Sequence, residues 1–248
     1  SLGDVLRTTV ILHFFKNDYV SWLVDRKALD LLEDNKYIKR TLIYDSNSQE
    51  LLKKEKFDVV INLEKLPSVC DFSDSLTARR HFGFRSNYNN GKIGHGDACK
   101  KLTELSRDSN QRKENREPWQ KILSEAIEKQ WRGEPYILGY KPKSKVKYDI
   151  GFNWATSANW TNKAWPKDNW HKLEGLIKAK YSISWQRGLH SIRDYIEWIN
   201  SCRLIITADT LGLHLGLALG KKVIALFGPT PWQEIYFYNL GSFLTPSE

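Results

Sequence analysis

The stretch LIITADTLGLHLGLALGKKVIALF, residues 204–227, decides the fold class of this chain. Its two ends, Leu204–Thr207 and Val223–Phe227, are apolar and branched, as are strands that are buried on both faces of a sheet. Between them, Leu211–Leu219 predicts an apolar helix, and the polar turn Asp209-Thr210 precedes it. A strand, a helix and a strand in this order form one unit of a parallel sheet, with the polar turn at the carboxyl end of the first strand.

The same alternation of apolar runs and amphipathic segments extends towards the N-terminus. Further strands are expected at Tyr19–Val24, Thr41–Tyr44, Asp58–Leu63, Tyr148–Trp154 and Tyr181–Trp185. Further helices are expected at Val5–Lys16, Arg26–Glu33, Glu50–Lys56, Trp119–Gln130, Trp170–Ala179 and Ile192–Asn200. The pattern predicts an α/β protein with parallel sheets and helices on both faces.

One segment interrupts this alternation. Residues from Lys92 to Gln130 are polar and helical in character, and glycines and prolines follow before the next strand. We interpret the segment as the connection between two Rossmann-like domains, residues 1–142 and 143–248. The chain opens on the loop-like Ser1-Leu2-Gly3-Asp4, so we expect a first strand before Ser1.

The charge of the chain indicates an anionic partner. Its 248 residues carry a formal net charge of +9, which suits nucleic acid, an anionic membrane surface or a phosphorylated substrate. No long basic tract or nucleic-acid-binding motif accompanies the charge, so nucleic acid is not expected. No apolar run approaches the roughly 20 residues that span a bilayer. The three scattered cysteines form no CxxC pair, which is typical of reduced, cytosolic thiols.

Motifs for common cofactors and metals are absent from the sequence. It contains no GxGxxG, GxxxxGK[ST], GxSxG or HExxH pattern. It also lacks the Asp-x-Asp pair with which many sugar transferases hold a divalent cation, and its six histidines are dispersed. We therefore expect neither a metal site nor a bound cofactor.

Four loops at the expected carboxyl ends of strands, where ligands of open α/β sheets bind, carry polar side chains. In the first, Gly3 gives the backbone freedom to turn, and Asp4 stands at the start of a helix. Taken alone, Asp4 is more simply an ordinary helix cap. In the second, Gly151–Pro166, the side chains of Thr156, Ser157 and Lys163 are donors that suit a diphosphate.

The third and fourth loops lie on either side of the helix in the opening stretch. In the third, free amides after Asp209 and the positive end of the helix dipole form an anion site. Thr210 is a further donor there, and His214 lies one turn into the helix. In the fourth, Gly228-Pro229-Thr230, the glycine permits close approach of the backbone to a ligand.

The order and spacing of these motifs over nearly the whole chain resemble one known family. The stretches that carry the resemblance are Ser1–Thr9, Trp22–Val24, Phe57–Leu63, Asn162–Pro166, Asp209–His214, Ala218–Gly220, Val223–Phe227 and Gly228–Thr230. They are similar to stretches of glycosyltransferase family 9, the ADP-heptose:lipopolysaccharide heptosyltransferases. The sequence departs from that family at Leu211, where a glycine is usual and follows only at Gly212, and in the loop Ser184–Arg187, which often carries an acidic residue.

The resemblance implies a GT-B architecture, an acceptor-binding N-terminal domain and a donor-binding C-terminal domain. It also implies a further segment after Glu248. It further implies metal-independent transfer with inversion at the sugar, in which Asp4 is the general base and Lys163 is the second catalytic residue. The implied donor-binding residues are Thr156, Ser157, Lys163, Trp185, Gln186, Asp209, Thr210, Leu211, Gly212, His214, Gly228, Pro229 and Thr230. Four basic residues are assigned to the acceptor: Arg7, Lys65, Arg79 and Arg80.

We therefore expect a cytoplasmic enzyme that moves heptose from ADP-heptose onto a lipopolysaccharide core or a related acceptor. That acceptor is expected to be an anionic, lipid-linked saccharide, so peripheral contact with the inner face of the cytoplasmic membrane is also expected. Two alternatives stay open. One is another GT-B nucleotide-sugar transferase or epimerase, which has the same donor site. The other is a non-catalytic nucleotide-sugar-binding protein, against which Asp4 and Lys163 count.

Overall fold

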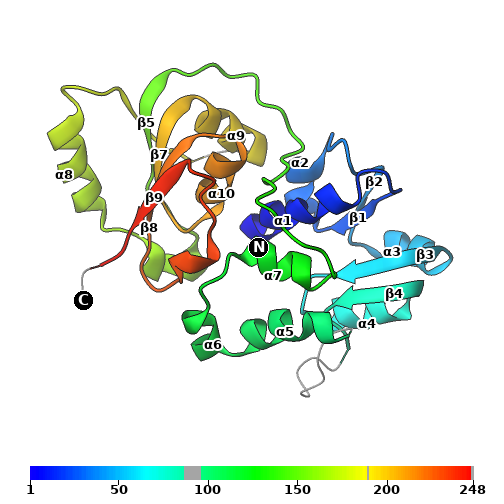
Figure 1. Ribbon diagram of the computed structural model, residues 1–248. Coiled ribbons are helices and arrows are strands. Elements are labelled where there is room, and N and C mark those ends of the chain that lie inside the picture. The colour runs from blue at the N-terminus through cyan, green and yellow to red at the C-terminus, as the bar shows by residue number, and fades with distance from the viewer. Residues whose placement is uncertain (87–95, 189, 247–248) are drawn as a thin grey trace.

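The computed structural model describes residues 1–86, 96–188 and 190–246, which form two α/β halves that pack side by side (Figure 1). In the C-terminal half, five parallel strands form one sheet in the order β6-β5-β7-β8-β9. The strands are β5 (Tyr148–Asn153), β6 (Ile183–Trp185), β7 (Cys202–Ala208), β8 (Lys222–Leu226) and β9 (Gly241–Leu244). The central strand β7 pairs with both β5 and β8 and is apolar on both faces.

Helices cover both faces of this sheet. On one face, α8 (Lys167–Ile177) packs through Trp170 against Phe152 and Ile206. On the other face lie α9 (Ile192–Asn200) and α10 (Leu211–Ala218), which pack against Ile205. Neighbouring residues 205 and 206 of β7 therefore belong to different cores, as the alternation of side chains along a strand requires.

In the described part of the N-terminal half, the strands form two separate parallel pairs. The pairs are β1 (Ser21–Val24) with β2 (Arg40–Ile43), and β3 (Lys56–Asn62) with β4 (Thr77–Gly83). Their connections contain α2 (Leu29–Leu32), α3 (Ser46–Lys53) and α4 (Pro67–Ser75). Beyond β4 lie α5 (Lys100–Arg107), α6 (Ser109–Glu114) and α7 (Trp119–Glu125), as the helical character of this region predicts; residues 92–95 of the predicted segment lie outside the described ranges.

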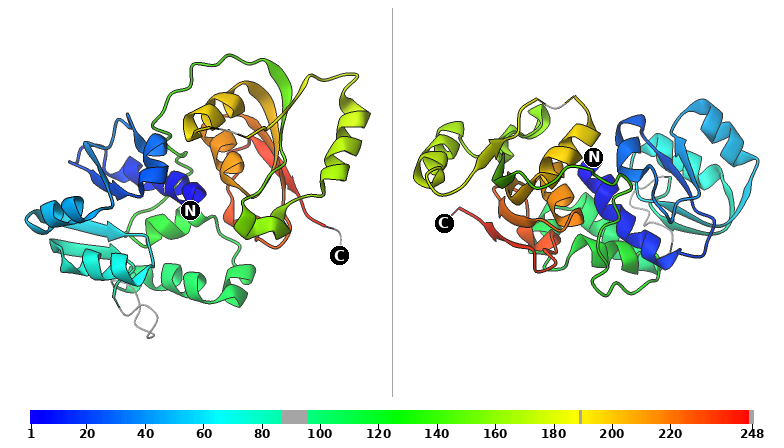
Figure 2. Two further views of the ribbon diagram at one scale, coloured as in Figure 1. Left: turned by 180° about the vertical axis from the view of Figure 1, so that it is seen from behind. Right: turned by 90° about the horizontal axis from the view of Figure 1, so that it is seen from above.

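Helix α1 (Leu2–Thr8) lies where the two halves meet, and it joins their cores (Figure 2). Its Leu6 is fully buried in one cluster with Leu31 of the N-terminal half and with Leu213 and Ile196 of the C-terminal half. A continuous apolar core therefore holds the halves together. None of the helices within the described ranges is long and apolar enough to cross a membrane.

The prediction of one helix over Val5–Lys16 is wrong in two respects. The helix begins earlier, at Leu2, and the α-helical part ends at Thr8, after which Thr9–Phe14 form a 3₁₀ helix. The hydroxyls of Thr8 and Thr9 donate to the backbone oxygens of Val5 and Leu6 three residues before them, and such bonds compete with regular α-helical bonding. Because α1 begins at Leu2, Gly3 lies within the helix and does not form the turn that was expected there.

Candidate active site

Hydrogen bonds from buried polar side chains fix the turn before α10. The Thr210 hydroxyl caps the helix by accepting from the Gly212 amide at 3.3 Å, and it also accepts from the Asn153 side chain at 2.9 Å. Tyr195 on α9 donates to the other end of that Asn153 amide at 2.6 Å. A side chain at 212 would overlap both Asn153 and Tyr195, so only glycine fits there.

This network changes one expectation about the turn. The amides of Gly212 and Leu213 are not free, because they donate to the hydroxyl and backbone oxygen of Thr210. The attraction of this end of α10 for an anion then rests mainly on the helix dipole and on a nearby cation.

Lys163 is that cation. Its ammonium donates to the Asp209 carboxylate at 2.7 Å and to the Asp209 backbone oxygen at 3.2 Å. Both side chains are mostly buried, at 15% and 17% exposure. Burial alone would raise the pKa of Asp209, but the nearby His214 and the Lys163 ammonium hold it below its usual range. The sequence motifs around residues 163 and 209, far apart in the chain, therefore meet in one ion pair.

His214 lies where predicted site residues from both halves converge. Its ring is buried beside Gly3 of α1 and contacts Tyr136 edge-on, with ring centroids 5.8 Å apart. Burial, together with the positive charge of Arg7, lowers the pKa of His214 to about 4. Asp209 and Asp4 act on the same ring in the opposite direction. The imidazole is therefore neutral at neutral pH.

Asp4 lies in the first turn of α1, and Ser1 is the cap. The Ser1 hydroxyl accepts from the Asp4 amide, and the Asp4 carboxylate accepts from Ser1 in return. Arg7 pairs with the same carboxylate at 2.6 Å. Burial would raise the pKa of Asp4, but the Arg7 guanidinium and the Ser1 hydroxyl hold it well below its usual range. The Asp4 side chain is half exposed, so an ionised carboxylate faces solvent on α1, which packs against α10.

Sequence reasoning missed a charged cluster that adjoins Asp4. Glu234, in a short 3₁₀ turn after β8, is only 3% exposed and accepts two hydrogen bonds from Arg112 of α6, at 2.6 and 2.8 Å. Arg7 approaches the same carboxylate at 3.8 Å. Both guanidinium groups lie over the Trp119 ring. No motif marks this cluster, because Arg7, Arg112 and Glu234 are each separated by more than a hundred positions along the chain.

The remaining predicted donor residues lie in loops near the carboxyl edge of the sheet. Thr156 and Ser157 precede the short helix that ends at Lys163, and Thr230 lies beside the Asp209 carboxylate. Gly228 approaches the backbone of that helix at Asn162. The remaining members are Pro229, which follows Gly228, Leu211 at the start of α10, and Trp185 and Gln186 at the end of β6. Trp185 donates to Glu174 of α8 at 2.8 Å.

The four basic residues assigned to the acceptor are not brought together. Arg7 is 8% exposed and pairs with Asp4, whereas Lys65 donates to the backbone of Ser106. Arg79 pairs with Asp58, and Arg80 pairs with Glu128. Both of these lie in the first half of β4, before its carboxyl end.

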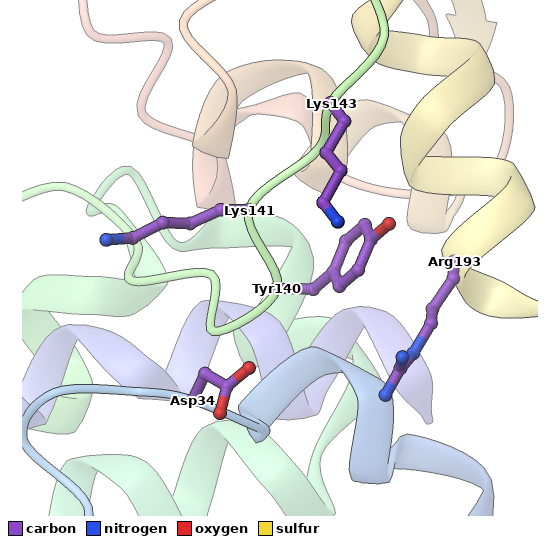
Figure 3. A pocket seen from close by; sticks show the side chains of 5 residues that line it. All are labelled: Asp34, Tyr140, Lys141, Lys143 and Arg193. Carbon is purple, nitrogen blue, oxygen red and sulfur yellow. The ribbon is translucent and has the colours of Figure 1, made fainter.

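The cavity shown in Figure 3 contains none of the predicted site residues. It has a volume of about 460 Å³ and lies between the end of α2, the segment that joins the halves, and the start of α9. Its lining is Asp34, Tyr140, Lys141, Lys143 and Arg193. Arg193 is engaged by Asp30 and Glu33. Within the described ranges, no cluster of three or more His, Cys, Asp or Glu side chains could hold a metal ion.

Comparison with known proteins finds one matching family model and several solved structures with a similar fold. Residues 188–240 match the model of glycosyltransferase family 9 (heptosyltransferase). A glycosyl transferase family 9 structure from Veillonella parvula is 17% identical, with a TM-score of 0.66, 100% of this chain covered and 85% of that one. E. coli heptosyltransferase WaaC with ADP is 15% identical, with a TM-score of 0.67 and coverage of 100% and 91%. E. coli ADP-heptose lps heptosyltransferase II is 12% identical, with a TM-score of 0.68 and coverage of 98% and 86%. No curated protein sequence matches this chain significantly.

The fold is thus the GT-B fold, and residues 188–240 are similar to glycosyltransferase family 9. The family match includes α9, β7, the turn at Asp209 and α10, the elements in which several of the predicted donor-binding residues lie. The resemblance to glycosyltransferase family 9, the heptosyltransferases, is confirmed.

Proposed function

We propose that this enzyme transfers heptose from ADP-heptose to a lipopolysaccharide core or a related saccharide, with inversion at the sugar and without a metal ion. The observation that carries the proposal is that α1, which contains Asp4, packs against α10 at Gly3 and His214, next to the turn that contains the Lys163–Asp209 ion pair. A base on one side and a cation on the other are what the two ends of a displacement at an anomeric carbon need.

The proposed donor site is the edge of the C-terminal sheet at α10. There the Lys163 ammonium and the positive end of the helix dipole neutralise the charge that develops on the departing diphosphate. The Lys163 ammonium donates to the Asp209 carboxylate at 2.7 Å. When the donor binds, its diphosphate takes the place of this carboxylate as the anionic partner of Lys163. E. coli heptosyltransferase WaaC, which shares the fold, has been solved with ADP and with ADP-2-deoxy-2-fluoro heptose, which supports an adenosine diphosphate sugar here.

The proposed base is Asp4. An acceptor hydroxyl loses its proton to the Asp4 carboxylate and attacks the anomeric carbon from the face opposite the diphosphate, while the bond to the diphosphate breaks. Because its pKa is low, the carboxylate is fully ionised at neutral pH, and it is half exposed to an incoming acceptor. The proton moves to the carboxylate in the transition state, as the new bond forms, which is general base catalysis.

The acceptor is proposed to be anionic and lipid-linked, which fits the net charge of +9 and contact with the cytoplasmic membrane face. The proposal is tested by incubating the enzyme with nucleoside diphosphate sugars and deacylated core oligosaccharides. We expect release of ADP and a product whose anomeric configuration, measured by NMR, is opposite to that of the donor. Retention of configuration, or binding of ADP-heptose without any transfer, would contradict the proposal.

A further inference from the structure

The buried carboxylate of Glu234 has no part in the chemistry proposed above. It belongs to the C-terminal half, yet both of its partners, Arg112 and Arg7, come from the N-terminal half. The bond to Arg112 is bidentate, which fixes the orientation of both groups as well as their distance. The residue therefore ties the two halves together beside Asp4.

Trp119 fixes the same two arginines from a third direction. The guanidinium carbon of Arg7 lies 4.9 Å from the ring centroid, and that of Arg112 lies 5.4 Å from it. Arg7 is thus held by the ring, by Glu234 and by Asp4. Because its guanidinium is rigid and planar, a displacement of Arg7 at Glu234 also moves the end that pairs with Asp4.

The charges of the cluster balance. Two guanidinium groups face two carboxylates, Asp4 and Glu234. Loss of the Glu234 charge leaves two positive groups over one ring with a single counter-charge, and an unpaired buried charge is costly. Arg112 is 41% exposed and can turn towards solvent, whereas the side chain of Arg7 is 9% exposed and cannot do so without moving α1.

We propose that Glu234 is a positioning residue for glycosyl transfer: it holds Arg7 against Trp119 and thereby fixes the Asp4 carboxylate relative to α10. The base is then aligned with the donor side when the two halves are docked through this cluster. The inference rests on the proposed function, since it concerns the alignment of its base.

The test is a double-mutant cycle in the full chain that combines Glu234→Gln with Arg7→Met, read as kcat and as ADP affinity. We expect Glu234→Gln to lower kcat by about 10²-fold, the effect of a misplaced reacting group, with unchanged ADP affinity. The double variant should be no slower than Arg7→Met alone, because Glu234 acts through Arg7. Glu234→Asp, which keeps the charge, should recover part of kcat and also serves if Glu234→Gln does not fold.

The matched control is Glu197→Gln. Glu197 on α9 also ties distant chain segments together, because it accepts bonds from Tyr140 and from the amides of residues 143 and 144. Loss of that carboxylate should lower Tm without the fall in kcat. Two results would overturn the inference alone: parental kcat in Glu234→Gln, or losses that multiply in the double variant. A parent chain that transfers no sugar overturns the proposed function and this inference with it.

Discussion

Gly3 and His214 touch across the boundary between the two halves: a Cβ atom at position 3 would lie 2.8 Å from Cδ2 of the His214 ring. The contact brings the start of α1, and with it Asp4, against the first turn of α10. Position 3 is helical, so its glycine is required by this close approach and not by the backbone conformation.

Gly3→Ala is therefore expected to force α1 away from α10. Overpacking of a buried contact costs about 1–3 kcal/mol, and Asp4, the proposed base, moves with the helix, so both Tm and turnover should fall. Gly175→Ala in α8 is the matched control, since a Cβ there meets nothing within 4 Å and alanine favours the helix. The account of this contact is wrong if Gly3→Ala has the stability and the turnover of the parent.

Lys163→Ala should weaken binding of ADP. The change removes a charge-assisted contact worth about 1.5–3 kcal/mol, which corresponds to an increase in Kd of roughly 10- to 150-fold. It also leaves Asp209 without its lysine, so the remaining charge repels the diphosphate. Calorimetry measures the effect, with Lys172→Ala, an exposed lysine of α8, as the control. Equal affinities in the parent and in Lys163→Ala would remove this lysine from the donor site.

Transfer should continue in an excess of EDTA. The charge on the leaving diphosphate is neutralised by Lys163 and the helix dipole in the proposed mechanism, so no divalent cation is needed. The rate of ADP release is measured before and after chelation. An activity that chelation abolishes and magnesium or manganese restores would require a different account of the leaving group.

The stability of the protein should fall as the pH drops from 7 to 5, in part because of His214. Its pKa is lowered to about 4 in the folded protein from 6.5, so the unfolded chain binds more protons in this range. The contribution is fully present above pH 6.5, and about 2 kcal/mol of it is lost by pH 5. His214→Phe should flatten the dependence, measured by urea unfolding at each pH. Parallel curves for the two proteins would show that His214 does not titrate in this way.

Much of the fold was predictable because its signal is local. The apolar runs of β7 and β8 and the glycine-rich helix between them follow directly from residues 204–227. Strand β4 was not predicted, because its sequence TARRHFG contains no apolar run. Most residues in the first half of the strand are exposed. Strand β9, at the sheet edge, was not predicted either, because it has only four residues and two of them are small.

The site divides in the same way. Asp4, Lys163, Asp209 and His214 could be proposed from the sequence because each stands in or directly after a recognisable loop motif. Glu234, Arg112 and Trp119 were missed, since nothing in their local sequence shows that a buried carboxylate and two guanidinium groups meet in space. The structure was also needed to show that Asp4 is not the helix cap. Ser1 is the cap, and Asp4 forms an ion pair with Arg7.

Asp4→Asn tests the central claim most directly, because asparagine keeps the shape and a hydrogen-bond acceptor but cannot take a proton. The account predicts a fall in kcat of about 10²–10⁴-fold with unchanged ADP affinity, since the proposed diphosphate contacts lie in the other half. Tm should decrease by a few degrees, because the ion pair with Arg7 is lost while the cap by Ser1 remains. Turnover close to that of the parent in Asp4→Asn, with ADP affinity and Tm as predicted, would contradict the assignment of Asp4 as the base.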